Sequence, residues 1–244
     1  MSEPNKSRSQ IAIWLLLLFA FTAVFYCLIL VAHKLEAGYL VIWILGFGGF
    51  PNQEFMGQLV DRKGLKASPT VSTVVYLILV GSVGLVHSIA DGLGEEIGCQ
   101  GFLVPELFKT IGFTGTALFS GIVWALWHYP VLIGADYDAG TPAWYSLTCI
   151  TVMVLALSFI FAWMRLKSGS LWTAALLYAS HNLYAQSIFT PLTHNSDNTP
   201  WFLDEFGVVL PIVTIAFVIF FWSRRGQLQP ILPQPTGQPL AVTG

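Results

Sequence analysis

Long apolar stretches are the feature that most limits what this chain can fold into. Seven of them are long enough, or nearly so, to cross the ~30 Å hydrocarbon core of a bilayer as helices. They are Ile11–Val31, Gly38–Val60, Val71–Ala90, Phe113–Gly134, Trp144–Met164, Leu171–Phe189 and Gly207–Trp222. Only 10% of the 244 residues are charged, whereas a soluble domain usually carries about 25%. We therefore predict an all-α fold, a polytopic transmembrane helical bundle.

Two parts of this pattern are irregular. Gly38–Val60 is interrupted by a glycine-rich run at 46–50 and then by Pro51. The segment Asp91–Thr110 is shorter and half-polar, which favours a re-entrant or partly immersed helix. With this segment, the count becomes about seven or eight membrane segments.

The two ends of the chain differ from the apolar middle. No small-residue cleavage site follows Ile11–Val31, so we interpret this stretch as a retained first span and not as a signal peptide. The tail 226–244 holds four prolines and little to bury, which predicts disorder. We expect residues 1–225 to form a single transmembrane domain and 226–244 to be a disordered cytoplasmic tail.

The positive charges predict an orientation. If Asp91–Thr110 crosses back, all Lys and Arg except Lys34 lie on one face of the membrane. Because positive loops stay in the cytoplasm, we expect a multi-pass integral membrane protein with both termini cytoplasmic. The net charge of -2 and the lack of a basic patch argue against nucleic acid as a partner.

Ionisable side chains inside apolar sequence are costly and point to function. Glu95 and Glu96 are adjacent, and His128, His181 and Asn182 follow in later apolar helices. Neighbouring residues of a helix point about 100° apart, so the two glutamates have different partners. A carboxylate and a histidine together can activate water. A helix start at the interface is the alternative for Glu95-Glu96, and helix–helix hydrogen bonding is the alternative for His181 and Asn182.

Other chemistries are poorly matched by the sequence. It has no HExxH zinc motif, no Gly-x-Ser-x-Gly elbow and no Gly-rich phosphate loop. The three cysteines form no CxxC pair, so neither a disulfide framework nor a zinc knot is indicated.

Several segments together resemble a known family. Glu95-Glu96-Ile97-Gly98-Cys99-Gln100-Gly101-Phe102-Leu103 is similar to a Glu-Glu-x-x-x-Arg motif followed by Gly-Phe-Leu. Trp124 to His128 is similar to Phe-x-x-x-His, and Tyr178 to Asn182 to His-x-x-x-Asn. The segment Ser168-Gly169-Ser170-Leu171-Trp172 looks like the corresponding segment in the bacterial branch of the same family. Between about Asp91 and Arg225, the chain resembles the CAAX-protease and bacteriocin-processing (CPBP) family of intramembrane endopeptidases, which contains the type II CAAX prenyl endopeptidases.

The resemblance implies an intramembrane endopeptidase. Glu95 or Glu96, with His128, would activate a water that attacks a peptide carbonyl, and Asn182 would help to hold the oxyanion, with His181 close by. A metal is left open: a divalent ion such as zinc would be held by Glu95, His128 and His181. The partners would be the lipid bilayer and a membrane-associated peptide or protein, prenylated or of the leader-peptide type. The location would be the bacterial cytoplasmic membrane.

Departures from the family pattern leave alternatives open. Gln100 stands where the family has arginine, Tyr178 where it has histidine, and Trp124 where it has phenylalanine. His181, three residues beyond Tyr178, is a candidate substitute for the missing histidine. One alternative is a catalytically impaired CPBP relative that acts as a membrane binding or immunity-type scaffold. A proton-relaying carrier is another, but it predicts an inverted repeat, and the sequence shows none.

Overall fold

A computed structural model describes residues 37–62, 68–134, 139–194 and 196–228 of the chain. These residues form helices, and no strand occurs among them apart from one isolated bridge, between Gly49 and His194. The predicted all-α class is confirmed for this part. The predicted first span, Ile11–Val31, and the tail from residue 229 lie outside the described residues.

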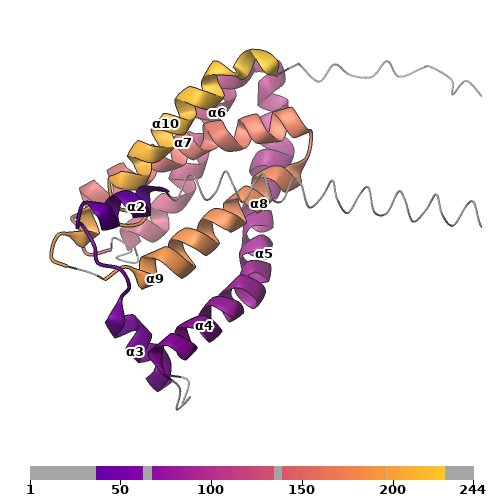
Figure 1. Cartoon of the computed structure of the whole chain (residues 1–244). Coiled ribbons are helices and arrows are strands. Elements are labelled where there is room, and N and C mark those ends of the chain that lie inside the picture. Colours follow the sequence, from indigo (N-terminus) through magenta and orange to yellow (C-terminus); the bar gives the residue numbers. More distant parts are fainter. Residues whose placement is uncertain (1–36, 63–67, 135–138, 195, 229–244) are drawn as a thin grey trace, which may run out of the picture.

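The helices follow one another with few interruptions (Figure 1). The α-helices are α2 (Ala37–Ile44), α3 (Gln53–Arg62), α4 (Pro69–Leu79), α5 (Leu85–Glu96), α6 (Val104–Gly134), α7 (Ala143–Ser168), α8 (Leu171–Asn182), α9 (Thr190–Leu192) and α10 (Val209–Ser223). Wider π-helical turns are η1 (Val80–Gly84), η2 (Ile97–Leu103) and η3 (Leu183–Phe189), and 3-10 turns are η4 (Thr199–Trp201) and η5 (Arg225–Gln227).

Two helical stretches of the described part are long and apolar enough to cross a membrane. They are Pro69–Gly134 and Ala143–Ser168, and Val209–Ser223 is a shorter apolar helix. Large apolar side chains lie exposed along them, with Phe102 70% and Ile122 50% accessible. This surface suits contact with lipid, and it supports a membrane helical bundle without fixing the number of its spans.

The structure corrects the predicted boundary between Ala90 and Asp91. α4, η1, α5, η2 and the first part of α6 form one continuous helix, which first leaves helical geometry at Gly112 (φ 65°, ψ -179°). Asp91–Thr110 is therefore no separate re-entrant segment, and it does not cross back. The drop in hydropathy misled the prediction, because several polar side chains of this segment face the interior of the bundle instead of water.

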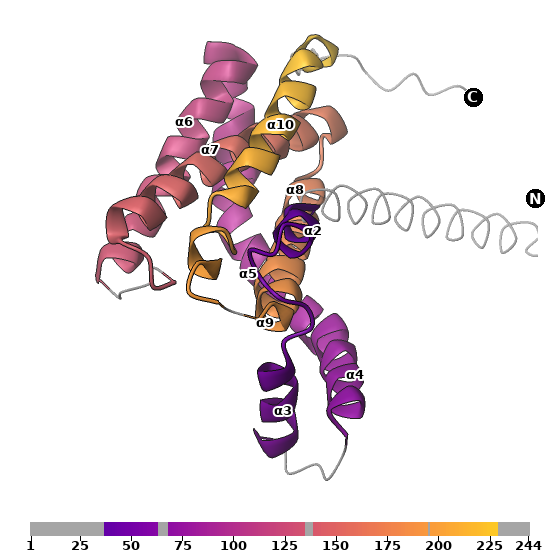
Figure 2. The ribbon, with the colours of Figure 1, turned by 60° about the vertical axis from the view of Figure 1, so that its left-hand side comes forward.

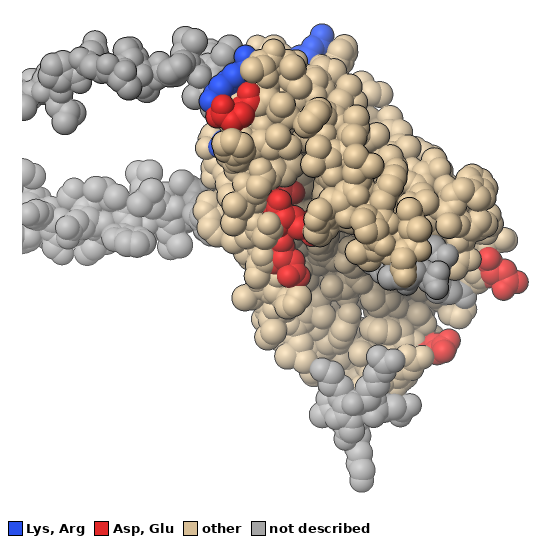
Figure 3. Space-filling view, turned by 180° about the vertical axis from the view of Figure 1, so that it is seen from behind, with Lys and Arg blue, Asp and Glu red and all other residues tan. Residues whose placement is uncertain are grey.

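The correction also removes the basis of the predicted orientation, which required Asp91–Thr110 to reverse direction. In Figures 1 and 2, the α3–α4 hairpin lies at one end of the long helix and the C-terminal end of α10 lies near the other. The basic side chains that the structure describes, which belong to Lys109, Arg165, Lys167, Arg224 and Arg225, lie near that second end, where Figure 3 shows basic side chains. The cytoplasmic placement of both termini stays a prediction.

Gly38–Val60 is not a single span. α2 and α3 are separated by a turn in which the ring of Phe47 stacks on Phe202, with centroids 3.9 Å apart. Asn52 then starts α3 by accepting a hydrogen bond from the amide of Phe55 at 3.1 Å. The glycine-rich run and Pro51 thus break the stretch where the sequence indicated.

Close approach between helices builds the core. A Cβ at Gly121 of α6 would meet side-chain atoms of Leu155 and Ser158 of α7 at 3.0 Å. A Cβ at Gly92 of α5 would meet the carbonyl oxygen of Ala175 and Cδ1 of Tyr178, both at 3.1 Å, on α8. These two glycines let α6 pack tightly on α7, and α5 on α8, which places the polar residues of α5, α6 and α8 around one space.

Candidate active site

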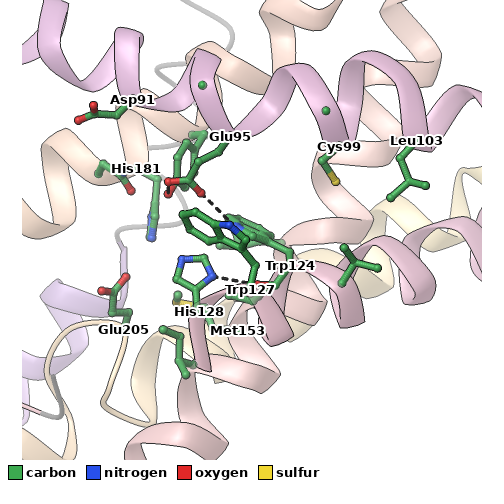
Figure 4. Close-up of a pocket in the computed structure, with 18 of the residues that line it drawn as sticks. Asp91, Glu95, Cys99, Leu103, Trp124, Trp127, His128, Met153, His181 and Glu205 are labelled. Carbon is green, nitrogen blue, oxygen red and sulfur yellow. Dashed lines mark hydrogen bonds between the residues drawn. The ribbon is translucent and has the colours of Figure 1, made fainter. Parts of the chain in front are cut away.

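A cavity of about 960 Å³ lies between α5, α6, α7 and α8. Figure 3 shows acidic side chains in a hollow near the middle of this face, with other charged side chains toward its edges, and Figure 4 shows the cavity close up. Of the residues predicted to act, Glu95, His128, His181 and Asn182 line it. Glu96 is not among the lining residues. Helices that are far apart in the sequence thus bring four of the five candidates together.

Glu95 is held by two hydrogen bonds, one to each carboxylate oxygen. The hydroxyl of Tyr178 donates to Oε1 at 2.9 Å, and the indole Nε1–H of Trp124 donates to Oε2 at 3.2 Å. The donors come from α8 and α6, while Glu95 lies on α5. Three helices therefore fix the orientation of this carboxylate.

Glu96 points elsewhere, as adjacent positions of a helix require. It is 2% exposed, and its Oε2 has no hydrogen-bond partner among the described residues. Gln100, one turn further on and 1% exposed, likewise has an Oε1 without a partner there. Arg165 of α7 donates from Nε to the backbone carbonyl of Gln100 at 2.7 Å. The guanidinium of Arg165 thus lies against the motif. It comes from α7, whereas the family pattern has its arginine within the motif itself, at the position of Gln100.

The ring orientation of His128 follows from its bond to the backbone. Nδ1 lies 2.9 Å from the carbonyl oxygen of Trp124, one turn earlier in α6. Since a carbonyl only accepts, Nδ1 carries the proton, and the lone pair of the neutral ring is on Nε2. Figure 4 shows the other ring nitrogen facing the open cavity. His128 can therefore accept a proton from a molecule bound there.

His181 and Asn182 reach the cavity from the end of α8. His181 is 2% exposed, and Figure 4 shows its ring pointing into the space between Glu205 and His128. The Asn182 side chain interacts with the hydroxyl of Tyr178. Asn182 therefore offers an amide N–H beside the Glu95 carboxylate, while His181 lies deeper in the bundle.

Four residues at the cavity, Trp124, Tyr178, Gln186 and Glu205, were not among the predicted site residues. Trp124 and Tyr178 were noted as departures from the family pattern, yet they hold Glu95. Glu205, from the loop before α10, accepts a hydrogen bond from Nε2 of Gln186 at 3.3 Å, and both line the cavity. The spacing of Tyr178, Asn182 and Gln186, each one turn apart, carried a signal, because it places three polar side chains on one helix face. No feature of the sequence around Glu205 indicated that this residue lies at the cavity.

The predicted metal set does not fit this arrangement. In the described part of the chain, no three His, Cys, Asp or Glu side chains are close enough together to share a metal ion. Glu95, His128 and His181 line one cavity without forming such a group. We therefore derive no step through a metal.

Two of the π-helical turns border the site. η2 begins directly after Glu96, and η3 begins directly after Asn182. Such wide turns inside α-helices are frequent at functional sites. Here each one changes the direction of side chains immediately beyond a candidate residue.

A cavity lined by glutamate and histidine side chains inside an apolar helical bundle is the arrangement expected of a membrane protein with a functional site among its helices. Residues 70–184 match the family described as type II CAAX prenyl endopeptidase Rce1-like. The predicted resemblance to this family is thereby confirmed for the segment 70–184. The match begins earlier than the predicted region Asp91–Arg225 and ends earlier, but it contains Glu95, His128 and Asn182.

A curated protein supports the same family resemblance. The chain is 24% identical over 143 residues to CAAX prenyl protease 2 of Methanococcus maripaludis. The alignment covers 57% of this chain and 46% of that protein, so the chain matches about half of the relative's length. No solved structure matches the chain.

Proposed function

We propose that the protein is an intramembrane endopeptidase that cleaves a membrane-associated peptide or protein with a water activated by Glu95 and His128. The observation that carries the proposal is the position of Trp124 between these two residues. Its indole donates to Glu95 and its carbonyl accepts from His128. One residue of α6 thus orients an acceptor carboxylate and a base toward the same cavity.

The first step is attack by water on the peptide carbonyl. The Glu95 carboxylate accepts a hydrogen bond from the water and directs its oxygen, and Nε2 of His128 takes a proton from it. The new C–O bond converts the carbonyl into a tetrahedral intermediate with a negative oxygen. The amide N–H of Asn182, held beside Tyr178, is the donor that we assign to this oxyanion.

The second step breaks the C–N bond. The protonated His128 returns its proton to the leaving nitrogen, and the intermediate collapses to a carboxylic acid and an amine. No cofactor is consumed, and His128 ends in its starting state.

The setting supports a substrate that reaches the site from the membrane. The cavity opens among helices whose outer faces are apolar, and its own wall includes Phe102, Leu103 and Val123. The relative's name refers to prenylated CAAX proteins. Prenylated C-terminal peptides and hydrophobic leader peptides are accordingly the two substrate types that we propose.

The test is cleavage of both peptide types by the purified protein in lipid, beside Glu95→Gln and His128→Gln. We expect one type to be cleaved, with product masses that identify the scissile bond, and both variants to lose at least 100-fold in kcat. Binding of peptide without cleavage, at equal affinity in all three proteins, would refute the enzyme and support the scaffold.

A further inference from the structure

Two departures from the family pattern converge on one side chain. Trp124 and Tyr178 stand where phenylalanine and histidine are expected, and each donates a hydrogen bond to a different oxygen of Glu95. Phenylalanine has no donor, so the bond from Trp124 exists only because of the departure. The replacements lie 54 positions apart (178 − 124) and on different helices, yet they serve the same carboxylate.

Packing fixes both donors. The rings of Trp124 and Tyr178 meet edge to face, with centroids 5.5 Å apart, and both contact Phe161, which is fully buried. Gly92 lets α5 approach α8 so closely that a Cβ at position 92 would lie only 3.1 Å from Cδ1 of Tyr178. Tyr178 itself is 7% exposed. Neither ring can turn aside without disturbing this cluster, so the donors are preorganised.

We infer that Trp124 and Tyr178 are positioning residues that clamp Glu95 from both sides, and that activity in this chain depends on the Tyr178 hydroxyl. The inference rests on the proposed function, since it gives Glu95 its orientation toward the attacking water. Two bonds from fixed donors stop the carboxylate from rotating.

Restoring the family histidine at position 178 would ordinarily be expected to raise activity, and the clamp predicts the opposite. An imidazole is shorter than a phenol, so Tyr178→His places no donor at the position of the tyrosine oxygen. Restoring the family residue alone is therefore expected to lower activity.

The test uses variants that keep the rings and remove the donors: Trp124→Phe, Tyr178→Phe and the double variant. Tyr76→Phe is the matched control, because its hydroxyl donates to the carbonyl oxygen of Ser187 and neither residue lines the cavity. We expect each single variant to lose about 10-fold in kcat, with KM changed by less than about 3-fold. We expect the double variant to lose less than the product of the single losses, because the two donors act on one group. Tyr178→His should resemble Tyr178→Phe.

A second readout does not require catalysis. A hydrophobic carbodiimide reacts with carboxyl groups, and mass spectrometry of the digested protein gives the labelled fraction of Glu95. Each donor occupies one oxygen of Glu95, and its removal leaves that oxygen open to the reagent, so labelling of Glu95 should rise about 3-fold or more in Tyr178→Phe and Trp124→Phe, but not in Tyr76→Phe.

The two readouts separate the two ideas. If the natural protein cleaves no peptide but the labelling changes as expected, the proposed function fails and the clamp stands. If the natural protein is active and both single variants keep its kcat and its labelling, the clamp is refuted. Higher activity in Tyr178→His than in the natural protein would refute the role of the hydroxyl.

Discussion

His128 donates from Nδ1 to the carbonyl oxygen of Trp124, 2.9 Å away and one turn earlier on α6. This bond leaves Nε2 as the only ring atom able to take a proton. The proton position of the proposed base is thus set by the backbone of its own helix, without a carboxylate partner. The same helix positions the indole that reaches Glu95.

Removing the base should abolish turnover without unfolding the protein. We expect His128→Ala to lower kcat by 100-fold to 10,000-fold, the usual range for loss of a general base. His87→Ala is the control, because that ring is 79% exposed and pairs with Asp91 at the surface. Single-turnover cleavage in lipid measures both, and a deficit of similar size in His87→Ala would mean that the loss is not specific to the base.

The adjacent glutamates should differ sharply. We expect Glu95→Gln to lose at least 100-fold in kcat, since an amide accepts less strongly from water and from both donors. We expect Glu96→Gln to stay within about 10-fold of the natural protein, because Glu96 does not line the cavity. Its thermal midpoint should change little, since glutamine keeps the size of the buried side chain. Equal losses of kcat in both variants would contradict the separation of roles.

Tight packing at Gly92 should be necessary for the site. A Cβ there meets the Ala175 carbonyl oxygen, which is backbone, at 3.1 Å. We expect Gly92→Ala to cost about 1–3 kcal/mol in stability, as overpacking usually does, and to reduce kcat about 10-fold through Tyr178. Gly81→Ala, with open space around the new methyl group, should change neither. Thermal unfolding in detergent and the peptide assay give the two values.

Asp204 should make stability depend on pH. Burial raises the pKa of this loop carboxyl, although bonds from the Glu205 amide and Thr190 and the charge of His181 oppose the shift. Because the folded-state pKa is above the unfolded value of about 3.9, its stabilising contribution is complete below that value and is lost as pH rises through the folded pKa.

The stability of Asp204→Asn relative to the natural protein should therefore increase as pH rises from 4 toward 8. Asparagine also suits the positive φ of 64° at this position. Differences in thermal midpoint between variant and natural protein, measured across that range, should grow with pH. A constant difference would mean that Asp204 keeps its ordinary pKa in the folded protein.

The sequence predicted the members of the site better than their interactions. Glu95, His128, His181 and Asn182 stood out because a polar group in an apolar helix must find a partner or a cavity. Tyr178 and Trp124 did not, because an aromatic ring in a membrane helix is consistent with packing alone. Only the close approach of α5 and α8 at Gly92 shows that the tyrosine hydroxyl reaches a carboxylate.

The helices were predictable where hydropathy was uniform. α7 lies close to the predicted Trp144–Met164, and α10 close to Gly207–Trp222. The prediction for Asp91–Thr110 failed because polarity usually indicates water, whereas here Glu95 lines a cavity between helices, and Glu96 and Gln100 are buried. Periodicity does not report whether a polar face is turned toward solvent or toward other helices.

The wide turn η2 makes the register of the chain matter as well as its composition. A π-helical turn holds an extra residue compared with an α-helix. Deleting one residue within Ile97–Leu103 would let the helix close into ordinary α geometry and keep every candidate side chain. Because the wide turn absorbs that residue, the helix before it would keep nearly its present direction, and Glu95 would stay near the indole of Trp124. A deletion in the regular helix between Val104 and Ile111 would instead swing α5 by about 100° relative to the rest of α6 and separate the two side chains. A sequence comparison that scored only matching letters would judge the two variants alike.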